Sequence, residues 1–444
     1  MKLYWIETWG CQMNEHDSEK MAGVLEGLGY APACALGQAD VVLLNTCAIR
    51  EKAEEKVFHM LDRLAGLKSR RPDMVIGVCG CVAQLTGEKV RERAPIVDLV
   101  LGPRAVSRLP EHLARLADER GIVDTTLYQD SLLGADRPVR REPGRAKAYV
   151  TVMEGCNKTC TYCVVPATRG REESRTLASI LAEVEGLAAE GYREVEFLGQ
   201  NVNAWRDPQT SAGLGDLLRA AGRVPGLARL RFTTSHPLHL GPRIIAAMAE
   251  VPQVCEHLHL PVQSGSDAVL KAMRRGYDRE KYLRKVDELR AAVPGIALST
   301  DVIVGFPGEG EEDFRQTLDL VRRVQFDQMF SFVFSSRPNT AAALMIDRGS
   351  LERKSERLVE LQALQREIQV ERHRSLVGTT AEVLVEGPSR RDPREWAGRA
   401  RTGHVVNLHA PAAHRGDILD VTITAAGPNS LRGELRADRG EQAS

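Results

Sequence analysis

The sequence lacks long apolar runs, and it lacks an excess of charge of either sign. No uninterrupted apolar stretch approaches the roughly 20 residues of a membrane-spanning helix, and the opening MKLYWIETWG has only a short apolar run before Glu7. We therefore expect no secretion signal and no membrane span, and a cytoplasmic protein. The 60 basic residues equal the 60 acidic ones, so contact with a nucleic acid would have to come from local patches.

The residue patterns that are typical of hydrolytic active sites are also missing from the sequence. There are no paired carboxylates, no serine with a histidine partner and no H-E-x-x-H in a context that supports hydrolysis. His257 and His259 alternate along an apolar strand, and with His236 and His239 they fit the wall of a core or pocket better than a catalytic role. No acid–base side chain is assigned as catalytic.

Cysteine, in contrast, is clustered. The chain has nine cysteines in 444 residues, and an odd number with clustered spacing favours metal chemistry in a reducing compartment over disulfides. Cys156, Cys160 and Cys163 form a C-x3-C-x2-C loop between a strand-like run and a helical pattern. Three thiolates on a 4Fe-4S cluster leave one iron open to a small molecule. Zinc would need a fourth ligand such as the distant Cys255, and three unrelated buried cysteines are a further alternative.

This loop, EGCNKTCTYCVVPATRGRE, resembles that of the radical S-adenosylmethionine (SAM) enzymes. The resemblance implies that the open iron binds the amino and carboxylate groups of SAM.

The first 124 residues alternate between strand and helix patterns. Strands are expected at residues 2–8, 41–45 and 74–78, and the first helix is expected to start near Asp17 or Ser18 and to stop at Gly29. This alternation predicts a Rossmann-like, doubly wound parallel sheet. Cysteines follow the carboxyl end of each strand, where such sheets gather ligands, so a second cluster site is predicted from Cys11, Cys47 and either Cys79 or Cys81, against the alternative of isolated apolar residues.

The segments TWGCQMNEHDSE, NTCAIREKAEEK and GCVAQ, at residues 8–19, 45–56 and 80–84, resemble the amino-terminal domain of the methylthiotransferases. That resemblance implies an auxiliary 4Fe-4S cluster on Cys11, Cys47 and Cys81. Cys34, Cys79 and Cys255 are then structural or free thiols.

Residues 125–147 lack periodicity and read as a linker. The basic residues between positions 137 and 147 could hold RNA phosphates or could form a solvated surface. They are Arg137, Arg140, Arg141, Arg145 and Lys147.

Residues 148–347 contain six strand patterns, the first at 149–153 and the others at 194–198, 230–233, 255–260, 296–304 and 328–334, with helical patterns between them. They predict an open, partial (βα)6 barrel with its site at the carboxyl ends of the strands. Four polar motifs, GQNVNAW, TTSHP, LPVQSGSD and VGFPGE, fall at those ends.

In the radical SAM family the corresponding loops surround SAM. The resemblance implies cofactor contacts from Gly199, Gln200, Asn201, Ser235, Gln263, Val302 and Gly305. Tyr162 would contribute a backbone contact to adenine, or only pack the loop. Arg169 and Arg171 would face RNA phosphate, or serve as salt-bridged scaffold.

Residues 348–376 form one charged helical stretch, and 377–438 return to short strands that predict a small β-barrel. This part resembles the TRAM domain, an OB-like RNA-binding module. Arg390, Arg391 and Trp396 could meet phosphates and stack on a base, or the tryptophan could be buried beneath a surface loop. The tail DRGEQAS is expected to be disordered.

The motifs GCQMNEHDSE, LGQNVNAW, FTTSHP and HLHLPVQSGSD with MRRGY resemble the MiaB-type tRNA methylthiotransferases nearly end to end. That family uses two 4Fe-4S clusters and SAM to methylthiolate C2 of N6-isopentenyladenosine beside the tRNA anticodon, the auxiliary cluster delivering the sulfur. A flavodoxin- or ferredoxin-like electron donor and a monomer are expected.

Alternatives are methylthiolation of threonylcarbamoyl-adenosine in tRNA or of a ribosomal protein, and a zinc-stapled RNA-binding protein without catalysis. One departure is Pro338-Asn339, where the tRNA enzymes more usually have Pro-Gly. We expect it to have little consequence.

Overall fold

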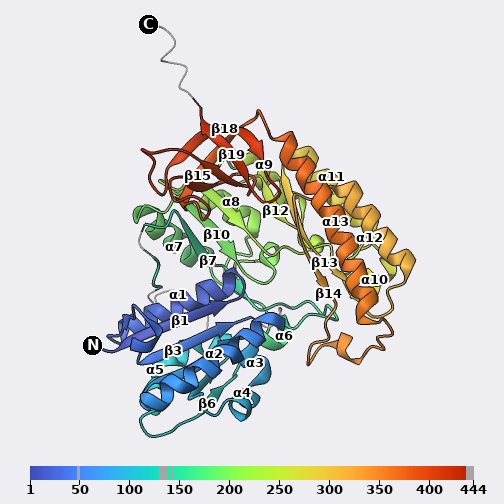
Figure 1. The fold of residues 1–444 in the computed structure, drawn as a ribbon. Coiled ribbons are helices and arrows are strands. Elements are labelled where there is room, and N and C mark those ends of the chain that lie inside the picture. Colours follow the sequence, from blue (N-terminus) through green and yellow to red (C-terminus); the bar gives the residue numbers. More distant parts are fainter. Residues whose placement is uncertain (48–50, 130–138, 143, 437–444) are drawn as a thin grey trace.

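The computed structural model describes residues 1–47, 51–129, 139–142 and 144–436. Figure 1 shows the amino-terminal domain below a partial barrel, and a small closed barrel at the opposite end of that partial barrel. Arg137 and the expected disordered tail lie outside the described residues. Within the described residues, no helix combines the length and the apolar character that a bilayer crossing requires.

The amino-terminal domain is a parallel six-stranded sheet with the order β2-β1-β3-β4-β5-β6. Its strands are β1 Leu3–Trp9, β2 Ala31–Pro32, β3 Val41–Thr46, β4 Val75–Gly80, β5 Leu99–Leu101 and β6 Ile122–Asp124. Its helices are α1 Gln12–Gly27, α2 Glu51–Arg70, α3 Cys81–Thr86, α4 Glu88–Arg93 and α5 Leu109–Arg115, with a 3-10 helix, η2, at Pro103–Arg108. The sequence predicted only β1, β3 and β4, because β2, β5 and β6 are too short to show a periodicity.

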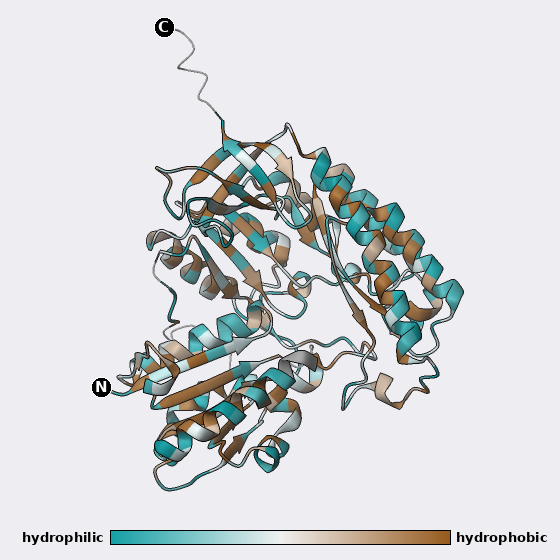
Figure 2. Cartoon of the chain, in the orientation of Figure 1, coloured by the Kyte–Doolittle hydropathy of each residue, from teal (hydrophilic) through white to brown (hydrophobic). Residues whose placement is uncertain are grey.

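The central strand β3 is buried along its whole length because helices cover both faces of the sheet. Val42 and Leu44 pack with α2 on one face, whereas Val41 and Leu43 pack with α1 and α5 on the other. Figure 2 shows this strand as a continuous hydrophobic arrow. The strand order reverses between β1 and β3, and open α/β sheets bind ligands at such a point.

The second domain is the predicted partial barrel. Its strands are β7 Lys147–Thr151, β10 Glu194–Leu198, β11 Arg229–Phe232, β12 His257–His259, β13 Ala297–Val304 and β14 Gln328–Val333. They form two parallel three-stranded sheets, β11-β10-β7 and β12-β13-β14, which a bridge between Leu230 and Val254 connects. The outer helices are α7 Leu177–Ala189, α8 Leu214–Ala221, α9 Pro242–Glu250, α10 Asp267–Ala272, α11 Arg279–Ala292 and α12 Glu311–Val324.

The carboxy-terminal part contains α13 Leu351–Ser375 and a closed five-stranded barrel. The barrel strands are β15 Thr380–Pro388, β16 Trp396–Ala400, β17 Val405–Leu408, β18 Ile418–Ala426 and β19 Leu431–Leu435. Leu361 and Ile368 of α13 are buried in the core of the partial barrel. The helix also contacts the small barrel, where His373 Nδ1 lies 2.7 Å from the Gly427 carbonyl oxygen, so it bridges the two barrels.

Two buried arginines attach the small barrel to the amino-terminal ends of the strands of the partial barrel. Arg229, the first residue of β11, is 0% exposed and donates to the Arg399 carbonyl at 2.7 Å and to Glu382. Arg231 donates to the carbonyls of Arg401 and Ala400 at 2.8 and 2.9 Å. The opposite, carboxyl ends of the strands remain for the site.

The predicted start of the first helix was wrong. Helix α1 begins at Gln12 with Cys11 as its N-cap, because the Asn14 side chain pairs with the Cys11 backbone. Asp17 is instead buried in an ion pair with Arg169. In the predicted linker, the four described basic residues pair with carboxylates of the same chain. These pairs are Arg140–Glu26, Arg141–Glu183, Arg145–Glu142 and Lys147–Glu196.

Asn339 explains why the departure from Pro-Gly is tolerated. Its φ is 62°, in the left-handed region that glycine favours and that asparagine adopts more readily than most residues.

Candidate functional site

The C-x3-C-x2-C loop lies at the carboxyl end of the partial barrel, between β8 Met153–Glu154 and α6 Val165–Arg169. Cys156, Cys160 and Cys163 are all half-buried. Burial raises the pKa of Cys163 to about 12, and the charges of Cys160 and Cys156 add to the effect. Burial also raises the pKa of Cys156. A metal centre would overcome the raised pKa values of Cys156 and Cys163, because a bound cation deprotonates its thiol ligands.

Arg275 supports this loop, and the sequence reasoning did not assign it a role. Its buried guanidinium donates from Nη1 to Cys160 Sγ at 3.4 Å and to the Tyr162 hydroxyl at 3.2 Å. Its Nε donates to the Tyr277 hydroxyl at 3.0 Å. The motif MRRGY contains both Arg275 and Tyr277, so it was the available signal. The Tyr162 side chain packs in a small apolar cluster, consistent with a role in shaping the loop.

Polar atoms without partners lie at the carboxyl ends of β10 and β11. Gln200 Nε2, Asn201 Oδ1, Ser235 Oγ and His236 Nε2 are buried and have no hydrogen-bond partner among the described residues. Gln200 Oε1 accepts from the Gly155 backbone at 2.5 Å, which ties this edge to the cysteine loop. Because buried polar groups are normally paired, these atoms fit a polar ligand such as the methionyl and ribose groups of SAM.

For the remaining predicted cofactor residues, the structure indicates whether the backbone or the side chain could contact a cofactor. Gly199 has no room for a side chain, since a Cβ would lie 2.6 Å from Met153 Cγ. Gln263 adopts a positive φ of 73°, and strained backbone of this kind gathers at functional sites. Gly305 has a φ of 70°, which glycine adopts without strain. The Val302 side chain is 0% exposed within the main core. The predicted contact from Val302 can therefore come only from its backbone, because its side chain faces the outer helices.

The second cysteine set lies at the carboxyl ends of three neighbouring strands. Cys11 follows β1, Cys47 follows β3 and Cys81 begins α3 after β4. A hydrogen bond from Cys47 and the nearby Arg169 charge lower the pKa of Cys11 despite its burial. Burial raises the pKa of Cys81, where Arg169 acts in the opposite direction and Cys11 adds to the rise. Cys81 lies near Cys11. The Cys79 side chain instead packs in the apolar core that includes residues of α1.

The other thiols and histidines stay apart from this arrangement. Cys255 is buried and Cys34 is exposed. His257 and His259 both contact Ser299 Oγ, at 3.3 and 3.0 Å. In the described part of the chain, no three His, Cys, Asp or Glu side chains converge closely enough to hold a single metal ion. A four-iron cluster is wider than one ion, so this result concerns mononuclear sites such as zinc.

Of the two roles considered for Arg169, the structure favours the salt-bridged scaffold over a contact with RNA phosphate. Arg169 is 3% exposed and its Nη2 lies 2.5 Å from Asp17 Oδ2, because α6 packs against the amino-terminal domain. Arg171 is exposed, and so are Arg390 and Arg391. Trp396 is half-buried against the core of the small barrel, which limits its free surface.

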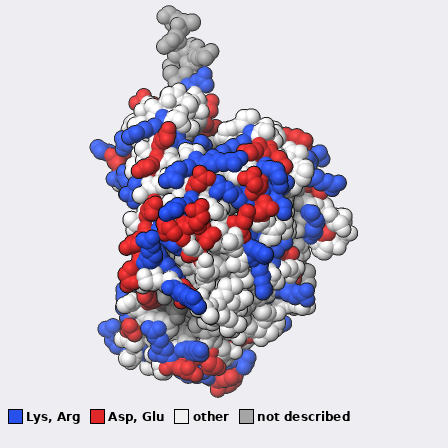
Figure 3. Space-filling view, turned by 90° about the vertical axis from the view of Figure 1, so that its right-hand side faces the viewer, with Lys and Arg blue, Asp and Glu red and all other residues white. Residues whose placement is uncertain are grey.

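Charges of both signs mix over much of the surface. Figure 3 shows Lys and Arg interspersed with Asp and Glu on the face that lies at the right of Figure 1. Three of the five arginines between residues 389 and 401 pair with carboxylates: Arg394 with Asp392, Arg399 with Glu386 and Arg401 with Glu256. Among the described residues, no carboxylate lies within 4.0 Å of Arg390 or Arg391.

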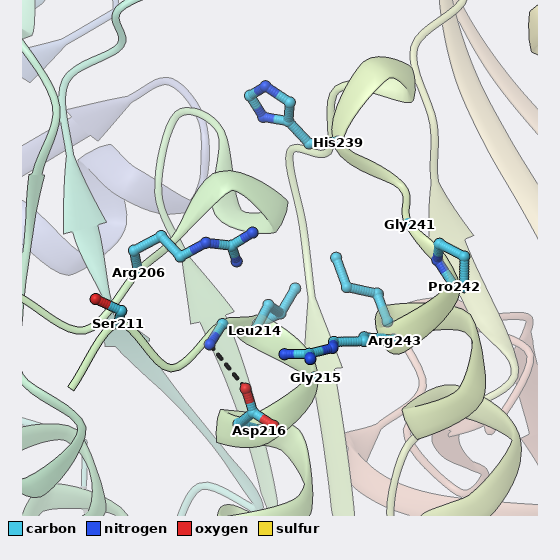
Figure 4. A pocket seen from close by; sticks show the side chains of 11 residues that line it. Arg206, Ser211, Leu214, Gly215, Asp216, His239, Gly241, Pro242 and Arg243 are labelled. Carbon is cyan, nitrogen blue, oxygen red and sulfur yellow. Dashed lines mark hydrogen bonds between the residues drawn. The ribbon is translucent and has the colours of Figure 1, made fainter.

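A pocket of about 540 Å³ lies beside the predicted SAM residues. Its wall includes Arg206, Arg243 and His239, and His239 Nδ1 is 3.2 Å from Asn201 Nδ2. Figure 4 shows the two arginine side chains reaching into the pocket from opposite walls. No carboxylate of the described chain lies within 4.0 Å of either guanidinium. The sequence reasoning missed this pocket because Arg206 and Arg243 are far apart in sequence.

Three family models match the chain: uncharacterized protein family UPF0004 over residues 3–102, the radical SAM superfamily over 150–321 and the TRAM domain over 374–435. Among solved structures, the radical SAM methyltransferase TsrM from Kitasatospora setae has a TM-score of 0.58 at 15% identity, covering 88% of this chain and 82% of that one. The cobalamin-dependent radical SAM enzyme OxsB has a TM-score of 0.51 at 12% identity, covering 83% and 56%. These likenesses show the fold.

Relatives of known name are much more similar in sequence. The tRNA-2-methylthio-N(6)-dimethylallyladenosine synthase of Acidithiobacillus ferrooxidans is 50% identical over 442 residues, which cover 98% of this chain and 97% of that protein. The protein of the same name from Alteromonas mediterranea is 47% identical over 442 residues, covering 98% and 91%. The chain therefore belongs to the tRNA-2-methylthio-N(6)-dimethylallyladenosine synthase family of radical SAM proteins.

Proposed function

We propose that this protein is a tRNA methylthiotransferase that acts at C2 of N6-isopentenyladenosine beside the anticodon. The observation that carries the proposal is the identity of 50% along 98% of the chain to a synthase of that modification. The geometry supports it, since one cysteine set follows the first barrel strand and the other follows three strands of the adjoining sheet. Sulfur insertion into an unreactive C–H bond requires cofactor chemistry that side-chain acids and bases do not supply.

The two cysteine sets would hold two 4Fe-4S clusters. Cys156, Cys160 and Cys163 would hold the cluster that binds SAM, with Gln200, Asn201 and Ser235 offering buried polar atoms to that cofactor. When bound there, the cluster and SAM would supply the radical chemistry that activates an unreactive C–H bond. The auxiliary cluster on Cys11, Cys47 and Cys81 would be the source of the sulfur.

The chain's own residues would shape this chemistry. Arg275 holds Cys160 and Tyr162 in place from behind the loop. Because Gly199 has no side chain, the end of β10 can lie against Met153. Packing of α3 against α6 keeps the two cysteine sets in neighbouring positions.

RNA would contact both ends of the partial barrel. Arg390 and Arg391 offer exposed guanidinium groups on the small barrel, and Arg171 offers one near the cysteine loop. Arg206 and Arg243 reach into a pocket next to Asn201, where they could neutralise a phosphate that flanks the target nucleotide. Arginine suits this role because its planar fork matches phosphate oxygens.

The tRNA substrate and the reduced thiols support a cytoplasmic protein. We also propose a flavodoxin- or ferredoxin-like electron donor and a monomeric state.

The test is turnover by protein reconstituted without oxygen, with SAM, dithionite and prenylated tRNA. We expect about eight irons per chain, four for each cluster, and 2-methylthio nucleoside by mass spectrometry. Cys81→Ala should abolish the product, whereas Cys79→Ala, the matched cysteine two residues away, should keep it. Product only with threonylcarbamoyl-adenosine tRNA or a ribosomal protein would replace the proposal, and colourless protein containing zinc would exclude it.

A further inference from the structure

Arg169 crosses from the radical SAM domain into the auxiliary cysteine site. It is the last residue of α6, the short helix that follows the C-x3-C-x2-C loop. At the start of this segment Val164 packs against Cys81 and Val82 of α3. The helix therefore links the C-x3-C-x2-C loop to Arg169, which lies at the auxiliary cysteine site.

The Arg169 guanidinium is buried among charged groups. Its Nη2 lies 2.5 Å from Asp17 Oδ2, and its Nη1 lies 3.6 Å from Glu154 Oε1. Both carboxylates are almost fully buried. Lys20 also approaches Glu154, at 3.8 Å, but its side chain is partly exposed.

The same guanidinium lies next to the thiols of Cys81 and Cys11, because α6 packs against α3, the helix that begins with Cys81. Nη1 has no well-formed hydrogen bond to any described residue. A buried donor without an acceptor is destabilising, so this N–H group fits an acceptor that the protein itself does not provide. Cluster sulfur is such an acceptor.

We propose that Arg169 is a positioning residue of the auxiliary cluster, donating into the site of Cys11, Cys47 and Cys81 and raising the reduction potential of the cluster held there. The inference rests on the auxiliary cluster of the proposed function. Cluster potentials depend on net charge and on hydrogen bonds to the sulfurs. When one electron enters from dithionite, the cluster becomes more negative by one charge, and a buried cation stabilises the reduced form.

The charges around Arg169 determine whether each substitution raises or lowers the reduction potential. Arg169→Gln removes the cation and leaves Asp17 and Glu154 uncompensated, so the potential should fall. Arg169→Lys keeps the charge but loses the planar fork, so the fall should be smaller. Asp17→Asn removes a negative charge from the same group, so the potential should rise. A purely structural role would not reverse sign between these variants.

The experiment measures this potential on a single cluster. In the full-length chain with Cys156, Cys160 and Cys163 all replaced by Ala, only the auxiliary site remains, and anaerobic reconstitution should load about four irons. Dithionite titration followed by electron paramagnetic resonance then gives the potential. For Arg169→Gln we expect at least a tenfold loss in the equilibrium constant for one-electron reduction, about 59 mV.

Arg104 provides the matched control. It is 2% exposed and crosses the same interface in the other direction, from η2 to the carbonyls of Arg169 and Arg171 at 2.7 and 2.8 Å. Arg104→Gln therefore loosens the interface without removing the charge that faces the thiols, and its potential should change less than twofold in the equilibrium constant.

Each possible result either supports or overturns the proposed role of Arg169. An intact cluster whose reduction constant changes less than twofold in Arg169→Gln overturns the inference, as does an equal shift in Arg104→Gln. If Arg169→Gln loses its iron, opposite shifts in Arg169→Lys and Asp17→Asn support the inference, and unchanged potentials in both overturn it. Failure of the parent to bind iron at Cys11, Cys47 and Cys81 would instead overturn the auxiliary site and the proposed function with it.

Discussion

Ser235→Ala should have opposite effects on stability and on cofactor binding. Ser235 is 4% exposed, and its hydroxyl has no partner among the described residues. A buried unsatisfied hydroxyl costs about 1–3 kcal/mol, so its removal should leave the SAM-free protein unchanged or stabilise it by up to about 1 kcal/mol. With SAM bound, the lost hydrogen bond is worth about 0.5–1.5 kcal/mol. That loss corresponds to about 2- to 12-fold weaker binding.

The matched control is Ser266→Ala. Ser266 is also buried, but its hydroxyl donates to Asp313 Oδ1 at 2.5 Å and caps the first turn of α10. Its removal should cost about 1 kcal/mol of stability and leave SAM binding unchanged. Thermal unfolding of cluster-loaded protein and anaerobic equilibrium dialysis with SAM measure the two quantities. The reasoning is refuted if Ser235→Ala is destabilised as Ser266→Ala is, with unaltered SAM affinity.

Three further outcomes follow from buried or unpaired charges. Arg229→Met should lower the free energy of unfolding by about 3–5 kcal/mol, because it leaves buried carboxylate and carbonyl groups unpaired, and hydrogen exchange should show the small barrel opening. Arg394→Met, at an exposed arginine, should leave the free energy of unfolding unchanged. Burial lowers the pKa of His404 from 6.5 to about 4; since the unfolded chain takes up the proton first, His404 should contribute about 2 kcal/mol to the loss of stability from pH 7 to pH 5. Other buried histidines with lowered pKa values add to that loss, so His404→Gln should make the profile shallower by its own share, and an unchanged profile would contradict the reasoning. Replacing Arg206 and Arg243 with Gln should reduce the slope of log affinity for tRNA against log salt by up to about 1.8 if both contact phosphate, and an unchanged slope would exclude the phosphate contact.

Regular patterns in the sequence were sufficient to predict the strands that carry the site. Six alternating segments with polar motifs at their ends predicted the partial barrel, and all six strands are present. The apolar run of β3 likewise predicted a buried strand. These patterns are local, because a strand's periodicity reports which of its own faces are buried.

Features that depend on a distant partner could not be predicted in this way. The sequence left Arg169 either facing RNA phosphate or forming a salt bridge, and it could not identify the partner, Asp17 of another domain. The start of α1 was misplaced for a related reason. Cysteine is not a usual N-cap, and only the arrangement at the sheet edge shows that Cys11 occupies that position beside Cys47.

The opposed ends of the partial barrel constrain how any RNA would bind. The small barrel is attached at the amino-terminal ends of the strands through Arg229 and Arg231, whereas both cysteine sets lie at carboxyl ends. Strand β13 has eight residues, which at about 3.3 Å each span about 26 Å. A ligand that touches Arg390 and the reacting site together must extend along the outside of the barrel for at least that length. An RNA stem-loop can meet this requirement and a single nucleoside cannot, so the proposed contact at Arg390 requires a structured RNA as substrate.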